Sequence, residues 1–329
     1  YRVGTGPVMV QGVSGADQVT FGGADSLTFN GTTYTYAAGS VSGIRIRSHD
    51  GDDALNLTGA TAAALLMGGA GNDSLIGGAG NDLLDGGTGN DCLIGAGGND
   101  SLVGGSGDDM YQFAPNTPLG SDTITEGAGA GTDLIDFSQA TTAVILDVSL
   151  TTAQVVNAQL TLTLSAGDGI ENLIGGSGAD ALTGNGLTNL IIGAAGNDTV
   201  LGGAGRDLVV GGSGSDTVRG GTDDDIVIGG TMSYYNEATR VLNQVAITAI
   251  LAEWNRTDSD YTTRISRLKN GGGLNGTYKL NSTTVVLDDG AVDILYGDAG
   301  LDWFLGALFS STSPDTFAGV GNGGKESIN

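Results

Sequence analysis

Aspartate recurs every nine residues in two stretches of the chain, and this spacing is the sequence pattern best suited to forming a binding site. Each of these aspartates is followed, two places later, by an apolar side chain. The first stretch holds Asp73, Asp82, Asp91, Asp100 and Asp109. The second holds Asp180, Asp198, Asp207, Asp216 and Asp225, with Glu171 and Asn189 at two further equivalent positions. Carboxylates in a fixed register supply oxygen ligands, which hard cations such as Ca²⁺ prefer.

The elements that must position these carboxylates are short strands and tight turns. The remaining positions of each nonapeptide predict a glycine turn and then a very short strand with one inward apolar side chain. Two nonapeptides complete one flattened coil, so aspartates 18 residues apart stack on one edge at roughly one strand spacing, about 4.8 Å. Two carboxylates about 5 Å apart repel by roughly 3 kcal/mol at an effective dielectric constant of about 20. A cation between them removes that repulsion, and an all-oxygen site suits Ca²⁺ better than Mg²⁺ or Zn²⁺.

The nonapeptide pattern G-G-x-G-x-D-x-U-x, where U is apolar, resembles the calcium-binding repeat of the RTX (repeats-in-toxin) proteins of secreted bacterial type. The resemblance implies several bound Ca²⁺ ions, each shared between turns n and n+2. The implied pairs are Asp73 with Asp91, Asp82 with Asp100, Asp91 with Asp109, Asp180 with Asp198, Asp198 with Asp216 and Asp207 with Asp225. Sites that touch Asn189 or Glu171 are expected to be weak or empty. Asp53, which precedes Asp73 by 20 residues, pairs with it if the intervening coil carries two extra residues.

The fold class predicted from these elements is all-β: a right-handed parallel β-roll or β-solenoid with a small α-helical insertion. Alternating apolar residues predict strands at 18–21, 26–29, 33–36 and 44–46. Six segments are expected along the chain: N-terminal cap coils (1–58), a first calcium array (59–112), metal-free solenoid coils (113–166), a second calcium array (167–230), a helical insertion (231–287), and the final solenoid turns with a C-terminal tail (288–329).

The insertion at 231–287 has its own pattern. Apolar spacing predicts helices at 236–255 and 258–270, followed by strands at 277–280 and 283–287. Its six basic and four acidic residues give a net charge of +2, which leaves −27 on the rest of the chain. The basic side chains form either an ordinary solvated helix face or a docking surface for the acidic solenoid of another subunit.

After the insertion the nine-residue period returns at Asp293 and Asp302. If the solenoid continues across the insertion, Asp216 shares an ion with Asp293, and Asp225 shares one with Asp302, each across 77 residues of sequence. Large aromatic side chains on either side of this junction are expected to pack between insertion and solenoid rather than to form a sugar-binding platform. They are Trp254, Trp303 and Phe304.

Composition argues against several classes of function. The 329 residues include 37 acids and 12 bases, a net charge of −25, which disfavours nucleic acid and anionic membrane as partners. No apolar run is long enough for membrane insertion, and the single cysteine, Cys92, cannot form an intramolecular disulfide. With one histidine, His49, which is expected in a turn, and no G-x-S-x-G motif, the chain lacks the usual zinc-protease and hydrolase signatures. An enzyme is therefore not expected.

The sequence thus favours an extracellular calcium-binding structural protein, secreted or at the cell surface, where it can contact that surface or a matrix. Such a chain is expected to be a self-assembling filament or surface-layer subunit, joined head to tail. The alternative is a detached RTX module of a secreted adhesin, toxin or enzyme, which serves calcium-triggered folding and export.

Overall fold

The structure is a computed structural model that describes residues 6–12, 14–22, 26–36, 41–126, 131–286, 290–306, 316–318 and 327–328. Short strands predominate, and the described residues contain two helices. Neither of these helices is long and apolar enough to cross a membrane. The chain divides into two compact units. Unit 1 comprises Tyr1–Phe137 with Leu150–Ile170, and unit 2 comprises Ser138–Ser149 with Glu171–Asn329.

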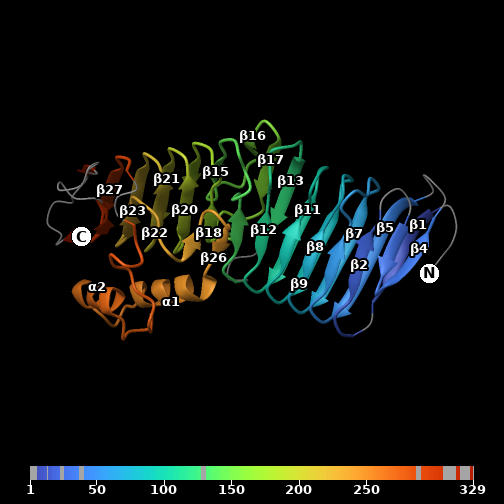
Figure 1. Ribbon diagram of the computed structural model, residues 1–329, viewed down its shortest axis with the longest axis horizontal. Helices are drawn as coiled ribbons and strands as arrows, with labels where there is room; N and C mark the ends of the chain where they lie inside the picture. Colours follow the sequence, from blue (N-terminus) through green and yellow to red (C-terminus); the bar gives the residue numbers. More distant parts are fainter. Residues whose placement is uncertain are drawn as a thin grey trace. The chain divides into compact units, whose positions relative to one another are not determined.

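Unit 1 contains two sheets between which the chain alternates (Figure 1). The first runs in the order β1 (Gly6–Gln11), β5 (Val41–Asp50), β7 (Ala64–Ala70), β9 (Leu83–Thr88), β11 (Ser101–Ser106), β13 (Gly120–Thr125), β17 (Leu160–Leu164) and β16 (Gln154–Asn157). The second runs in the order β4 (Thr32–Thr35), β3 (Ser26–Phe29), β2 (Gln18–Phe21), β6 (Ala54–Asn56), β8 (Ser74–Ile76), β10 (Cys92–Ile94), β12 (Met110–Gln112) and β14 (Leu134–Asp136). Neighbouring strands are parallel except in the β2–β3–β4 meander and the β16–β17 hairpin.

The pairing register in unit 1 shows that two nonapeptides make one coil. Leu84 of β9 pairs with Leu102 of β11, and Leu75 of β8 pairs with Leu93 of β10, in each case 18 residues apart. All four side chains are fully buried. Each repeat therefore contributes one apolar residue to the core, as the sequence pattern predicts, and the fold is a parallel β-roll.

Unit 2 repeats this architecture with two parallel sheets. One runs β15 (Ile145–Asp147), β19 (Ala181–Thr183), β21 (Thr199–Ala204), β23 (Thr217–Thr222), β27 (Ile294–Ala299) and β29 (Thr316–Ala318). The other includes β18 (Asn172–Ile174), β20 (Leu190–Ala195), β22 (Leu208–Ser213), β24 (Ile226–Ile228), β28 (Trp303–Leu305) and β30 (Ser327–Ile328). Strand β23 pairs with β27, and β24 with β28, so the coils continue on the far side of the insertion in the predicted register.

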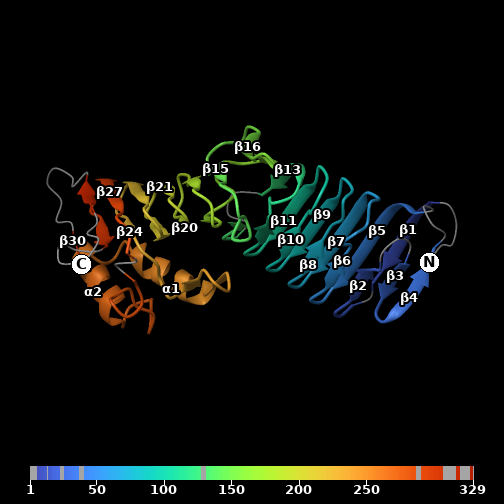
Figure 2. The ribbon, with the colours of Figure 1, turned by 45° about the horizontal axis from the view of Figure 1, so that its top comes forward.

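The insertion consists of a hairpin, β25 (Tyr235–Asn236) and β26 (Val241–Leu242), followed by α1 (Gln244–Trp254) and α2 (Tyr261–Asn270). Both views place the two helices along one side of the unit 2 coils (Figures 1 and 2). The predicted helix start at residue 236 is wrong, because Asn243 caps α1 by accepting a hydrogen bond from the Ala246 N–H at 3.0 Å.

The strands predicted at 277–280 and 283–287 are also not formed among the described residues. The Asn281 side chain accepts a hydrogen bond from the Thr283 N–H at 2.9 Å, which folds the chain into a turn. Only an isolated antiparallel bridge between Met232 and Val285 is present in this region. Residue 287 lies outside the described residues.

Aromatic packing between the helices and the coils agrees with the sequence prediction. Trp254 of α1 and Trp303 of β28 are both fully buried, with ring centroids 6.4 Å apart. The Trp254 indole N–H donates to the Asp224 carbonyl at 2.8 Å, and the Tyr261 hydroxyl donates to the Asp302 carbonyl at 2.6 Å. The helices are therefore fixed to the backbone of one periodic aspartate, Asp302, and of the residue that precedes another, Asp225.

Candidate metal centre

The periodic aspartates form ladders along the turns of the β-roll. In each pair, the backbone N–H of one aspartate donates to Oδ1 of the aspartate one coil later, as from Asp73 to Asp91 at 2.7 Å. The pairs joined in this way also include Asp53 with Asp73, Asp82 with Asp100, Asp91 with Asp109, Asp180 with Asp198, Asp198 with Asp216, Asp207 with Asp225, Asp216 with Asp293 and Asp225 with Asp302. The structure thus brings together every pair expected from sequence, while their binding of an ion stays a prediction.

In many of these ladder aspartates the second carboxylate oxygen, Oδ2, is buried without a hydrogen-bond partner, whereas Oδ2 of Asp82 and of Asp180 each accepts a backbone N–H. Among the described residues, this unpaired Oδ2 is found in Asp53, Asp73, Asp91, Asp100, Asp109, Asp122, Asp198, Asp207 and Asp225. Each of these side chains is at most 3% exposed. Leaving a buried oxygen unpaired costs free energy, and more so when the group is charged. Repetition of that cost over many turns indicates that the oxygens face a ligand.

The space that each Oδ2 faces is lined by further oxygen. Beside Gly193, Oδ2 of Asp198 lies 2.6 Å, and the Gly211 carbonyl oxygen of the next coil 2.5 Å, from the point where a Cβ atom would stand. The same convergence of one carboxylate and one carbonyl recurs beside Gly68 and Gly86. Glycine leaves this space open, and its oxygen lining is the ligand set that Ca²⁺ prefers. The residues present therefore fit the ion.

Asn189 supplies an internal comparison, because it stands where the ladder would place an aspartate. Its Oδ1 accepts from the Asn185 N–H at 2.9 Å, and its Nδ2 donates to the Glu171 carbonyl at 2.8 Å and to Asn185 Oδ1 at 3.1 Å. The amide N–H groups of Asn189 thus donate to two oxygens within the chain. The Asn189 Oδ1 and the Gly202 carbonyl still converge beside Gly184, so weak or empty sites at Asn189 and Glu171 stay a prediction.

Electrostatics at the ladder disfavour the metal-free carboxylate. Burial, and then the nearby charges of Asp109 and Asp73, raise the pKa of Asp91 to about 7. Burial also raises the pKa of Asp207 to about 8. No lysine or arginine occurs between Arg47 and Arg206, so the coils in that span have no lysine or arginine of their own to neutralise their carboxylates. Neutralisation of Asp91 and of the other ladder carboxylates within that span therefore calls for protons or for a metal ion.

These shifts predict how the metal-free chain depends on pH. Because the folded pKa values of Asp91 and Asp207 lie above the ordinary value of 3.8, the fold binds protons that the unfolded chain releases. Their contribution to stability is complete below about pH 4 and is lost as the pH rises through about 7 to 8. The metal-free chain is therefore expected to retain more β-structure at about pH 5 than at about pH 8, as measured by circular dichroism after exhaustive dialysis.

In saturating Ca²⁺ the chain is expected to be more stable at about pH 8 than at about pH 5, because protons compete with the ion for the same oxygens. The dialysed and the calcium-saturated samples, melted at both pH values, provide the comparison. A metal-free chain that is more stable at the higher pH would contradict the assignment of these shifts to the buried ladder.

Sequence reasoning missed several acidic residues that extend the ladder in unit 1. The Asp100 N–H donates to Asp122 Oδ1 at 2.9 Å, and the Asp109 N–H donates to Asp133 Oδ1 at 2.8 Å. Their separations of 22 and 24 residues break the period of 18. Both lie in segment 113–166, predicted as metal-free coils, so the carboxylate ladder extends further than the nine-residue period indicates.

A sequence signal for these two residues does exist, because each is followed two places later by an apolar residue. Those residues, Ile124 and Ile135, are fully buried. Asp17 was missed as well: its N–H donates to Asp53 Oδ1 at 2.5 Å, and its own Oδ1 accepts from Asn30 at 2.7 Å. The prediction that His49 lies in a turn is wrong, because the residue belongs to β5 and pairs there with Gly69, with a φ of 82°.

Comparison with known proteins agrees with this geometry. The RTX calcium-binding nonapeptide repeat matches residues 58–93, 84–111, 165–200, 183–218 and 201–231. No curated protein matches the chain. Repeats of this kind bind Ca²⁺ and are structural rather than catalytic. The buried carboxylate ladders within residues 58–111 and 165–231 therefore lie in segments that match RTX calcium-binding nonapeptide repeats.

Proposed function

We propose that the chain acts outside the cell as a structural protein whose β-roll is completed by bound Ca²⁺. The observation that carries this proposal is the row of buried Oδ2 atoms without hydrogen-bond partners, because a fold that leaves them unpaired is incomplete without its ligand. RTX repeats are typical of secreted bacterial proteins, and extracellular calcium modules work at roughly 10⁻⁴ to 10⁻³ M Ca²⁺. Calcium would thus couple folding to arrival outside the cell.

We further propose that copies of the chain associate end to end into a filament or surface layer. Strand β1 is the outermost strand of its sheet among the described strands, and its Met9 side chain is 57% exposed. The free edge of a strand presents backbone N–H and C=O groups to which another chain can pair. A contact between two different surfaces of the molecule builds a filament when its rotation does not close into a ring.

The basic side chains of the insertion do not add to this proposal, because several are engaged within unit 2. Arg264 is almost fully buried and donates to Asp224 Oδ2 at 2.6 Å. Arg256 and Arg267 contact the buried Glu253, at 3.4 and 3.2 Å. The positive charge of the insertion thus binds it to the acidic coils of its own unit and to its own helices.

Analytical ultracentrifugation of the chain in Ca²⁺ tests the assembly. The expected result is a series of species that grows with protein concentration and is lost in chelator. Met9→Lys should suppress that growth, because a charged side chain on an edge strand opposes pairing. Leu83→Lys, at a 39% exposed position in the interior strand β9, is the matched control and should assemble like the parent chain.

A monomer at every concentration in Ca²⁺ would contradict self-assembly. It would leave the calcium-dependent fold in place and favour the other role: a folding and export module of a secreted adhesin, toxin or enzyme.

A further inference from the structure

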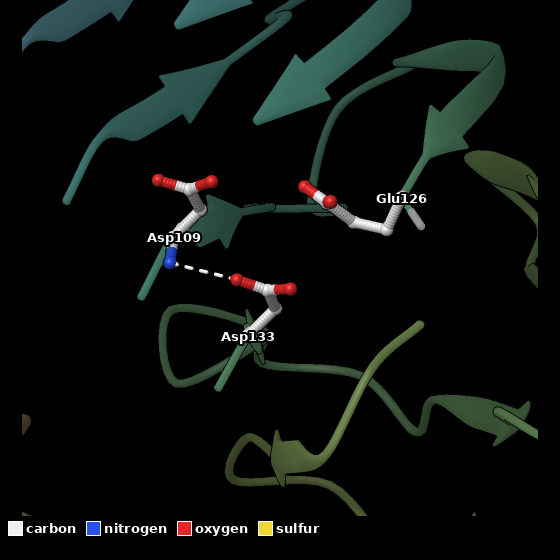
Figure 3. A group of neighbouring side chains, drawn as sticks. All are labelled: Asp109, Glu126 and Asp133. Carbon is white, nitrogen blue, oxygen red and sulfur yellow. Dashed lines mark hydrogen bonds between the residues drawn. The ribbon is translucent and has the colours of Figure 1, made fainter. Parts of the chain in front are cut away.

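Three acidic side chains converge where the first ladder loses its regular period. Carboxylate oxygens of Asp109, Glu126 and Asp133 all lie within 4.8 Å of one another, and all three side chains are buried. In Figure 3 the Glu126 side chain extends from its own strand end toward Asp109 and Asp133. These residues belong to unit 1, and Glu126 and Asp133 lie outside the nonapeptide pattern. We call them the three-carboxylate group.

One oxygen in this group is buried without a hydrogen-bond partner. Asp109 is 1% exposed, and its Oδ1 accepts from the Asp91 N–H at 2.8 Å, while its Oδ2 has no partner in the described part of the chain. This Oδ2 faces the open space beside Gly104, and an oxygen of Glu126 faces the same space. The unpaired atom is therefore aimed at the second carboxylate of the group.

The ligand set beside Gly104 differs from that of the regular turns. Beside Gly86, one coil earlier, the Asp91 carboxylate faces a backbone carbonyl, that of Gly104. Beside Gly104, Glu126 Oε1 and the Tyr111 hydroxyl lie next to Asp109 Oδ2, where the regular turn has a backbone carbonyl. The last turn of the array thus exchanges a neutral oxygen for a charged one, which increases its attraction for a cation.

Tyr111 fixes the orientation of this additional carboxylate. The fully buried phenol donates a hydrogen bond to Glu126 Oε1 and accepts one from the Gly104 N–H at 2.6 Å. The aromatic ring is therefore joined directly to one member of the three-carboxylate group, and it can report on an ion bound there.

We propose that Asp109, Glu126 and Asp133 form a separate cation site that closes the first array and binds Ca²⁺ more tightly than the repeat turns do. Three carboxylates around one space favour a hard cation of high charge, so trivalent lanthanide ions are ligands of the same chemistry. The proposal does not depend on self-assembly or on the role of the chain outside the cell.

The test is a titration of the full chain with Tb³⁺, in which light absorbed by tyrosine is re-emitted by a nearby Tb³⁺ ion. The first equivalent is expected to give strong sensitised emission, because Tyr111 adjoins the site. Glu126→Gln should raise the dissociation constant for the first ion by at least about tenfold, because affinity follows the charge and orientation of the ligands. Equal affinity in Glu126→Gln and the parent chain would overturn the proposal.

Asp108→Asn is the matched control. It removes one negative charge from the adjacent, exposed position and keeps an oxygen that can accept from the Thr132 N–H. Because an exposed charge contributes little, its dissociation constant should change by less than about threefold. A loss as large as that of Glu126→Gln would show that net charge, and not this site, sets the affinity, and would also overturn the proposal.

Tyr111→Phe keeps all three carboxylates and tests the proposed cation site if Glu126→Gln does not fold. Circular dichroism in saturating Ca²⁺ establishes whether each variant folds. In Tyr111→Phe the emission from the first equivalent should fall to background, while calorimetry counts the same number of bound ions. Sensitised emission that persists at the first equivalent would place the tightest site elsewhere in the chain and contradict the proposal.

Discussion

Removal of Ca²⁺ at about pH 8 is expected to abolish most of the β-structure of the chain, because the buried ladder carboxylates are then ionised and no longer neutralised. An ion present at about 1,000 times its dissociation constant stabilises the fold by about 4 kcal/mol per site, whereas whole domains are stable by about 5 to 15 kcal/mol. Loss of several such sites exceeds that margin. Far-ultraviolet circular dichroism in chelator should therefore show a largely unfolded chain.

Addition of millimolar Ca²⁺ should restore the spectrum, and the same concentration of Mg²⁺ should not. Magnesium holds its water tightly and demands a regular octahedron, which suits this lining of carboxylate and carbonyl oxygen poorly. The two tryptophans of the chain, Trp254 and Trp303, are fully buried in unit 2, so a red shift of their fluorescence reports unfolding there. A spectrum that is unchanged in chelator would contradict the metal dependence altogether.

The second large effect is expected from one added methyl group. Gly212, in β22, has a φ of 115°, and a Cβ atom on it would collide with the carbonyl oxygen of Ala194 in the preceding coil. Gly212→Ala therefore combines an unfavourable backbone conformation with a clash against backbone that cannot rotate away. A loss of more than about 3 kcal/mol in the free energy of unfolding is expected.

Gly186→Ala is the matched control in the same unit. A Cβ atom on Gly186 meets nothing within 4 Å, and this residue has no positive φ. Its substitution should change the free energy of unfolding by less than about 1 kcal/mol. Urea denaturation in saturating Ca²⁺ measures both variants. Similar stability of the two would show that neighbouring coils can separate at the turn, against the tight stacking described above.

The coil architecture could be predicted from sequence because the aspartates and the apolar core residues follow the same nine-residue period. Leu75 and Leu93 lie in register because every repeat has the same length, and Gln18–Phe21 and Ser26–Phe29 have the bounds that their alternation predicts. Even the junction after the insertion was predictable, since Asp293 and Asp302 resume the period.

What sequence could not show is where the repeat length changes. Asp122 and Asp133 join the ladder after coils of 22 and 24 residues, so a fixed period passes over them. Glu126 reaches the ladder from outside the repeat, and only the folded chain shows that its oxygen replaces a carbonyl. In the insertion, Asn243 and Asn281 override the apolar spacing through local hydrogen bonds to the backbone.

The absence of lysine and arginine between Arg47 and Arg206 has a further consequence for cleavage of the chain by proteases. Trypsin and its relatives cleave after lysine or arginine, and residues 48–205 contain neither. This span, which holds the first array and the beginning of the second, would remain one uncut piece whether folded or unfolded. Its resistance to such proteases would come from its amino-acid sequence and not from its fold. The resistance would therefore be retained even where calcium is scarce.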